Sequence, residues 1–131
     1  MLQRIAWAGG IASGWPATGV TVCDAPGRQQ SGRMIATADG VICAWTDARS
    51  DFGDIYASSI RANGAVAAYW PANGLLICGA QGMQYRPVMA PNALGGAFIA
   101  WLDQRDFPTH SDDLYAQTVT RDARLDAELA P

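Results

Sequence analysis

The sequence predicts an all-β protein made of consecutive four-stranded antiparallel sheets that pack face to face. Two observations predict the repeated architecture: a long unit of sequence recurs at separations of 55 to 59 residues, and its apolar runs are short and bounded by turn-forming residues. A third observation is composition, because 14 glycines and 7 prolines favour many turns over long helices.

The repeat rests on segments that keep their order. Three pairs carry it: Trp15–Cys23 with Trp70–Cys78, AWTDAR (44–49) with AWLDQR (100–105), and DIYASSI (54–60) with DLYAQTV (113–119). The separation grows because small insertions fall near residues 91–96 and between residues 105 and 113, where loops are expected. Matches that tolerate loop insertions in this way indicate a structural repeat.

Each repeat offers four short strand candidates separated by turn-rich segments. They are GVTVC (19–23) or GLLIC (74–78), RMIATA (33–38) or RPVMAP (86–91), GVICAWT (40–46) or GAFIAWL (96–102), and DIYASSI (54–60) or DLYAQTV (113–119). Apolar spacing typical of a helix is confined to residues 122–130.

The strand at residues 40–46 is apolar on both faces, as is its counterpart at 96–102. Val41, Cys43 and Trp45 point one way, and Ile42 and Ala44 point the other. A strand buried on both sides belongs to a sheet packed between other sheets. The DIYASSI strand (54–60) is more polar and is expected nearer the rim of its sheet. Four antiparallel strands per repeat, stacked sheet on sheet, describe blades of a β-propeller.

The chain holds about two to two and a half such blades. The first residues of the chain form the end of a partial copy of the repeat. Its matching residues are Ile5, Gly9, Ile11 and Trp15, each 55 residues before its counterpart at positions 60–70. We therefore predict the end of a first partial blade in residues 1–23, a complete blade in 24–78, and a second blade lacking its outermost strand in 79–131. A closed ring needs at least about four blades. The chain is therefore expected to be a fragment of a longer protein or to complete a ring with other copies.

A family resemblance becomes visible at residues 38–64, ADGVICAWTDARSDFGDIYASSIRANG. This stretch resembles a blade of TolB-type, WD-repeat-like propellers. It is similar also to the tandem W-x-D-x-R…D-I-Y-A-Q repeats of large secreted bacterial proteins, and the similarity covers nearly all of residues 2–125. The resemblance implies a propeller segment in an extracellular or cell-envelope setting, with neighbouring blades as its partners.

The recurring W-x-D-x-R motif has an expected structural role. Asp47 can accept backbone N–H bonds in the turn, and Arg49 can pair bidentately with Asp54 across the hairpin. The counterparts in the second repeat are Asp103, Arg105 and Asp113. Trp45 is expected to bury area between blades and Tyr56 to hydrogen-bond at a sheet edge, as are Trp101 and Tyr115.

Other candidate sites are weaker. Calcium is one alternative, since several acids crowd each of two equivalent loops. These acids are Asp47, Asp51 and Asp54 in one loop and Asp103, Asp106, Asp112 and Asp113 in the other. His110 is expected to be a solvated loop residue, and Cys23, Cys43 and Cys78 to be small buried residues without a disulfide.

These observations favour a non-catalytic interaction or display module with no cofactor, no metal and no assigned catalytic residue. A carbohydrate-binding propeller is the alternative, using Trp15 and Trp70 if they are exposed, although packing between blades is the expected role of both. A propeller glycosidase is disfavoured because the inner strands bring Arg33 and Arg86 but no acid. A net charge of −3 without a basic cluster argues against nucleic acid, and no apolar run approaches the roughly 18 residues of a membrane span.

Overall fold

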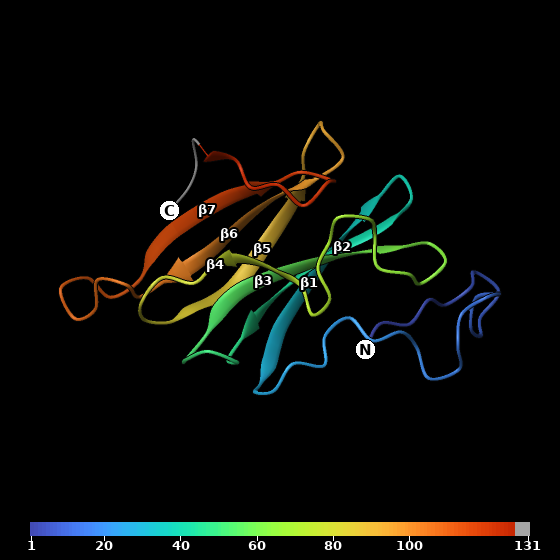
Figure 1. The fold of residues 1–131 in the computed structure, drawn as a ribbon, viewed down its shortest axis with the longest axis horizontal. Helices are drawn as coiled ribbons and strands as arrows, with labels where there is room; N and C mark the ends of the chain where they lie inside the picture. The colour runs from blue at the N-terminus through green and yellow to red at the C-terminus, as the bar shows by residue number, and fades with distance from the viewer. Residues whose placement is uncertain (128–131) are drawn as a thin grey trace.

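The computed structural model describes residues 1–127 and is all-β, as the sequence predicts. One antiparallel sheet has the order β1 (Gln29–Thr37), β2 (Gly40–Asp47), β3 (Asp54–Arg61) and β4 (Leu75–Cys78). The other has the order β5 (Gln84–Pro91), β6 (Ala97–Asp103) and β7 (Asp113–Val119). The two sheets do not close into a ring, and the architecture is consistent with incomplete propeller blades (Figure 1).

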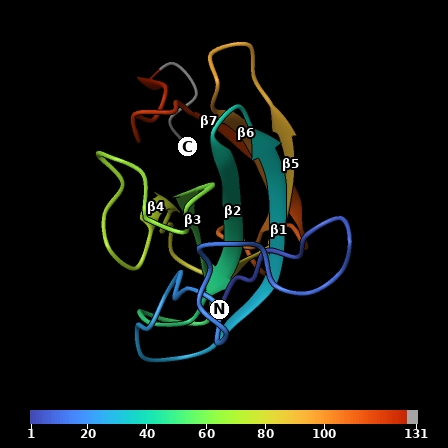
Figure 2. The same cartoon turned by 90° about the vertical axis from the view of Figure 1, so that its right-hand side faces the viewer.

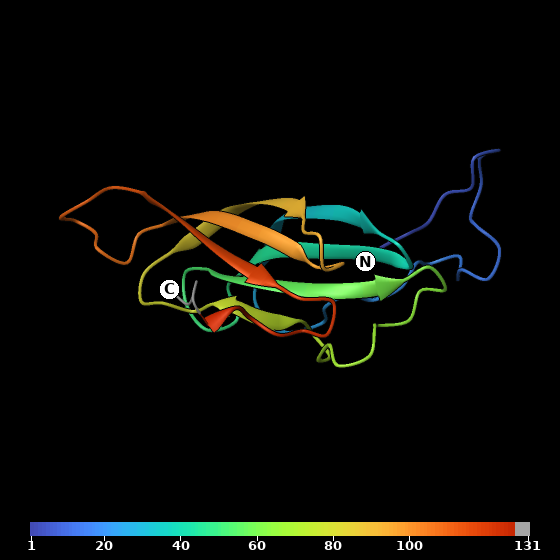
Figure 3. The same ribbon diagram turned by 90° about the horizontal axis from the view of Figure 1, so that it is seen from above.

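The two sheets form two layers with the hydrophobic core between them (Figures 2 and 3). The core side chains come from alternate positions of the central strands, which is why one face of each strand is buried. The first sheet contributes Ile42, Ala44, Ile55 and Ala57, and the second contributes Ala97, Ile99, Trp101 and Val119. Full burial of a large apolar side chain such as Trp101 stabilises the fold by about 2–3 kcal/mol.

Both sheets carry the same irregularity near their first strand. The pairing of β1 with β2 shifts between Gln30 and Arg33, and that of β5 with β6 shifts between Tyr85 and Val88. The positive-φ residues at the two bulges are Ser31 (φ 57°) and Arg86 (φ 54°). Arg86 therefore corresponds to Ser31, and the sequence-based pairing of RMIATA with RPVMAP is wrong by two residues. A shift of two preserves the inward and outward alternation, so apolar pattern cannot detect it.

The predicted strand GVTVC (19–23) does not form, and Val20 makes only an isolated bridge with Leu2. In the complete repeat the corresponding strand, β4, pairs with β3. The backbone of residues 19–23 has only the short segment around Leu2 to pair with, and that segment forms a single bridge rather than a ladder. The bridges Ile5–Ile11, Ile60–Val66 and Val119–Leu125 occur at matching positions of all three copies.

The helical spacing expected at residues 122–130 does not give a helix over residues 122–126. A turn at residues 121–123 lets Leu125 bridge back to Val119, residue 127 is in a 3-10 conformation, and residues 128–130 of the predicted range lie outside the described residues. The DIYASSI strand, β3, is not at a rim: it runs between β2 and β4 and is buried along nearly its whole length.

Two-sided burial holds better for β2 than for β6. In β2, Ile42, Ala44 and Trp45 are buried, while Val41 and Cys43 are half-buried. The inner face of β6 is buried, but Phe98 on its outer face is 50% exposed. The prediction of a doubly buried strand is therefore wrong for β6, because no described element covers that outer face.

Candidate functional site

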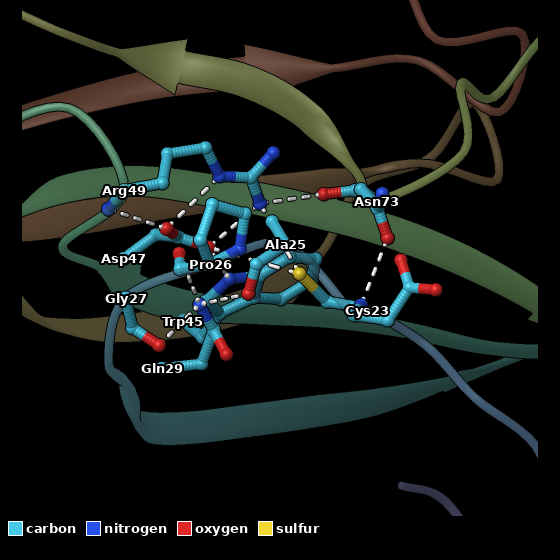
Figure 4. A network of polar contacts seen from close by, with 10 residues as sticks. Cys23, Ala25, Pro26, Gly27, Gln29, Trp45, Asp47, Arg49 and Asn73 are labelled. Carbon is cyan, nitrogen blue, oxygen red and sulfur yellow. Dashed lines mark hydrogen bonds and ion pairs between the residues drawn. The ribbon is translucent and has the colours of Figure 1, made fainter.

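A polar network lies at the end of β2, where the chain turns toward β3 (Figure 4). The carboxylate of Asp47 is fully buried and accepts a hydrogen bond at 2.7 Å from the indole N–H of Trp45. Arg49 donates its backbone N–H at 3.0 Å and its Nε at 2.9 Å to Oδ1, and its Nη2 at 2.7 Å to Oδ2. The predicted acceptance of a backbone N–H by Asp47 is confirmed.

The same network recurs at the end of β6. The buried Asp103 accepts the indole N–H of Trp101 at 2.9 Å. Arg105 donates its backbone N–H at 2.9 Å, its Nε at 3.1 Å and its Nη2 at 2.8 Å to the same carboxylate. Fork-shaped pairing of this kind fixes both distance and orientation. Both copies of the W-x-D-x-R motif therefore form the same hydrogen-bonded arrangement.

The expected arginine partners are wrong. Arg49 pairs with Asp47 rather than Asp54, and Arg105 with Asp103 rather than Asp113. The reason is local, because the turn after Asp47 directs the arginine back along its own strand. Its guanidinium then lies 3.9 Å from the centre of the Tyr56 ring. Tyr56 and its counterpart Tyr115 therefore act through their ring faces, as cation–π partners, rather than as edge hydrogen-bond donors.

Each arginine also contacts the preceding repeat. Arg49 Nη2 lies 3.2 Å from the Cys23 sulfur, and Arg105 Nη2 lies 3.4 Å from the Cys78 sulfur. Within its own repeat, Arg49 Nη2 also donates to the carbonyl oxygen of Asn73 at 2.8 Å. Sequence reasoning missed the contact with the cysteine, although the cysteine recurs at a constant distance from Trp-Pro in both repeats. The thiol is thus a bridge between consecutive repeats. Cys78 is buried, but Cys23 and Cys43 are only half-buried, which corrects that expectation.

The electrostatics of the network favour its charged form. Burial alone would raise the pKa of Asp47, but hydrogen bonds from Arg49 and Trp45 outweigh it and hold the pKa below its usual range. The pKa of Asp103 is lowered for the same reasons. Burial raises the pKa of the Cys43 thiol to about 11 and also raises that of Cys78. At neutral pH both of these thiols are therefore protonated and poor nucleophiles.

The two Trp-Pro tryptophans link neighbouring repeats. Trp15 donates its indole N–H to the carbonyl oxygen of Ala62 at 2.8 Å, and Trp70 donates to that of Arg121 at 2.8 Å. Ala62 and Arg121 occupy matching positions just after β3 and β7. Trp70 is only 5% exposed, so it offers no free ring face to a ligand.

The acids of the two equivalent loops fall into two groups: some are held by hydrogen bonds within the fold, and others are exposed. Asp47 and Asp103 are engaged by arginine, and Asp51 accepts the backbone N–H of Gly53 at 2.9 Å. Within residues 1–127, three groups that could ligate a metal come together at Asp106, His110 and Asp113, with ligand atoms within 4.8 Å of one another. His110 lies on the exposed loop, where the sequence places it.

No family model, curated protein or solved structure matched this chain in the comparisons. Among residues 1–127, no helix is long and apolar enough to cross a membrane.

Proposed function

We propose that this chain is a segment of a β-propeller of the TolB-like type, acting as a non-catalytic interaction or display module of a secreted or cell-surface bacterial protein. On this reading residues 1–23 end a preceding blade, residues 24–78 form a complete blade, and residues 79–131 form a blade without its outermost strand. The extracellular setting follows from the motif resemblance alone.

One observation carries the proposal: the ionisable residues that recur are used to join repeats. Asp47 and Arg49 neutralise each other and contact Cys23 of the preceding repeat. Asp103 and Arg105 do the same with Cys78. The lone pairs of each carboxylate are occupied by N–H donors, so neither carboxylate is free to act as a catalytic acid or base. The recurring motif therefore supports a structural role over a catalytic one.

Carbohydrate binding is the second candidate, and the N-terminal surface favours it. A groove of about 430 Å³ is lined by Trp15, Arg4 and Met34 among other residues. Trp7 is fully exposed nearby in sequence, and aromatic rings beside donors such as arginine are suited to sugar rings. The buried Trp70 cannot contribute in the same way.

A glycan array of the purified chain separates the two candidates. The scaffold proposal expects no sugar class whose signal disappears in Trp15→Ala or Trp7→Ala. Phe52→Ala, which removes an exposed ring remote from the groove lining, is the matched control. Strong binding of one sugar class that depends on Trp15 but not on Phe52 would replace the scaffold with a lectin. Hydrolysis of a sugar polymer that is lost on changing a single Asp would make the chain an enzyme.

A further inference from the structure

The second sheet has an outer face that is apolar and uncovered. Cross-strand pairing places Phe98 beside Ala90, and Leu102 beside Leu114, on the side away from the first sheet. Val88 is 55% exposed, Phe98 50% and Leu114 75%. We call Val88, Phe98 and Leu114 the outer face. Clustered apolar side chains of this size on a sheet mark a contact surface.

The first sheet shows what covers such a face. The first-sheet residues that match Phe98, Ala100, Leu114 and Ala116 are Ile42, Ala44, Ile55 and Ala57, and each is at most 1% exposed. Val88 lies at the border of this face, because its match in the first sheet is the exposed Arg33. The four first-sheet residues are buried by the sheet β5–β7, which is built from the same repeat. The same face of the repeat is therefore covered in the first sheet and exposed in the second. In the first sheet, the element that covers it is the sheet β5–β7.

The complementary surface is also present and partly free. The side chains that cover the first sheet include Ala97, Ile99 and Trp101 of β6. Their counterparts in β2 are Val41, Cys43 and Trp45, on the side facing away from the second sheet. Val41 and Cys43 are only half-buried.

Met34 is 57% exposed beside Val41 and Cys43 and lines two grooves there, of about 430 and 470 Å³. We call Met34, Val41 and Cys43 the receiving face. One chain thus carries both halves of the contact between sheets, on opposite sides.

We propose that the outer face binds the receiving face of a second copy of this chain, head to tail. The proposal rests on the proposed function as an interaction module and names its partner. Because the two faces differ, the contact is heterologous and generates rings or open chains rather than symmetric pairs. Its geometry repeats the contact that β5–β7 already makes with β1–β4.

The N-terminal segment of the receiving copy gives way in this assembly. Residues 1–11 occupy repeat positions that correspond to residues 115–125, as the matching bridges Ile5–Ile11 and Val119–Leu125 show. The incoming β7 therefore replaces them. They are weakly packed, since Ile5 is 63% exposed and Trp7 is fully exposed. Residues 19–23, left with one bridge here, then gain the outer edge of β7 as a partner, as β4 pairs with β3.

Sedimentation and light scattering of the full chain over a range of concentrations test this contact. We expect the wild-type chain to associate, and Leu114→Glu or Met34→Glu alone to be monomeric. Mixing these two variants should restore a one-to-one pair and double the mass, because each variant keeps one intact face. Leu94→Glu is the matched control, since Leu94 is 69% exposed but lies in the β5–β6 turn.

Three results would overturn the proposal: a folded wild-type chain that stays monomeric, association unchanged by Leu114→Glu, or a mixture of the two variants that does not pair. Circular dichroism checks that each variant folds, and Phe98→Glu replaces Leu114→Glu if the latter does not, since the match of Phe98 in the first sheet is the buried Ile42. The glycan array is read on the Leu114→Glu variant, whose receiving face and its groove stay uncovered, so failure of the partner and failure of the proposed function give different results.

Discussion

Replacing Asp103 with alanine tests the energetic role of the recurring network. The substitution removes the acceptor of the Trp101 indole N–H and of three donors of Arg105. The Asp103 side chain is 0% exposed and that of Arg105 is 18% exposed, so the guanidinium is left with little water to replace the carboxylate. Breaking a buried pair from one side costs about 3–5 kcal/mol, against about 0–1 kcal/mol for a solvated pair.

Urea unfolding followed by far-ultraviolet circular dichroism measures this loss without depending on the altered tryptophan environment. Asp113→Ala is the control, because the motif alone predicts Asp113 as the partner of Arg105, and it should cost less than about 1 kcal/mol. The double variant Asp103→Ala with Arg105→Ala should lose less than the sum of the single losses, since no guanidinium is then stranded. An Asp103→Ala loss no larger than that of Asp113→Ala would refute the reasoning.

Three further predictions concern packing and pH. Trp70→Phe keeps an aromatic ring but removes the N–H donor that lies 2.8 Å from the carbonyl oxygen of Arg121. Thermal melts should show a loss of about 1 kcal/mol in the free energy of unfolding, and an unchanged free energy would contradict a stabilising hydrogen bond. Gly74→Ala (φ 93°) should destabilise far more than Gly32→Ala in urea unfolding, because its Cβ would lie 2.6 Å from an indole carbon while Gly32 faces open space. The lowered pKa values of Asp47 and Asp103 mean that their stabilisation is present above about pH 4 and is lost as the pH falls through the folded-state pKa. Melting temperatures should therefore drop steeply in acid, and less steeply for Asp47→Asn with Asp103→Asn; equal slopes would argue against this linkage.

Local signals were reliable for the parts of the network that are close in sequence. Asp47 lies two residues before Arg49, and a short acid at that spacing caps a turn, so its backbone contact could be predicted. The choice of Asp47 over Asp54 as the guanidinium partner could not be predicted. Both acids are opposite one another in the β2–β3 ladder, and only the direction of the turn decides between them.

The contact of Arg49 with Cys23 shows a second limit. These residues belong to different repeats and meet only when one repeat packs on the next. The cysteine and arginine each recur, but recurrence gives no distance between them. The wrong alignment of Arg33 with Arg86 has a different cause, since a bulge and a two-residue shift leave the same side chains on the same faces.

The all-β class, the repeat, and the positions of β2, β3, β6 and β7 follow from the amino-acid sequence alone. These features depend on side-chain alternation, turn residues and spacing within a few residues, which are local properties. The tertiary structure decided which carboxylate holds each arginine, which predicted strand lacks a partner, and which apolar face stays open. Those outcomes depend on which sheet lies against which, and a repeated sequence gives every copy the same faces without saying which of them is covered.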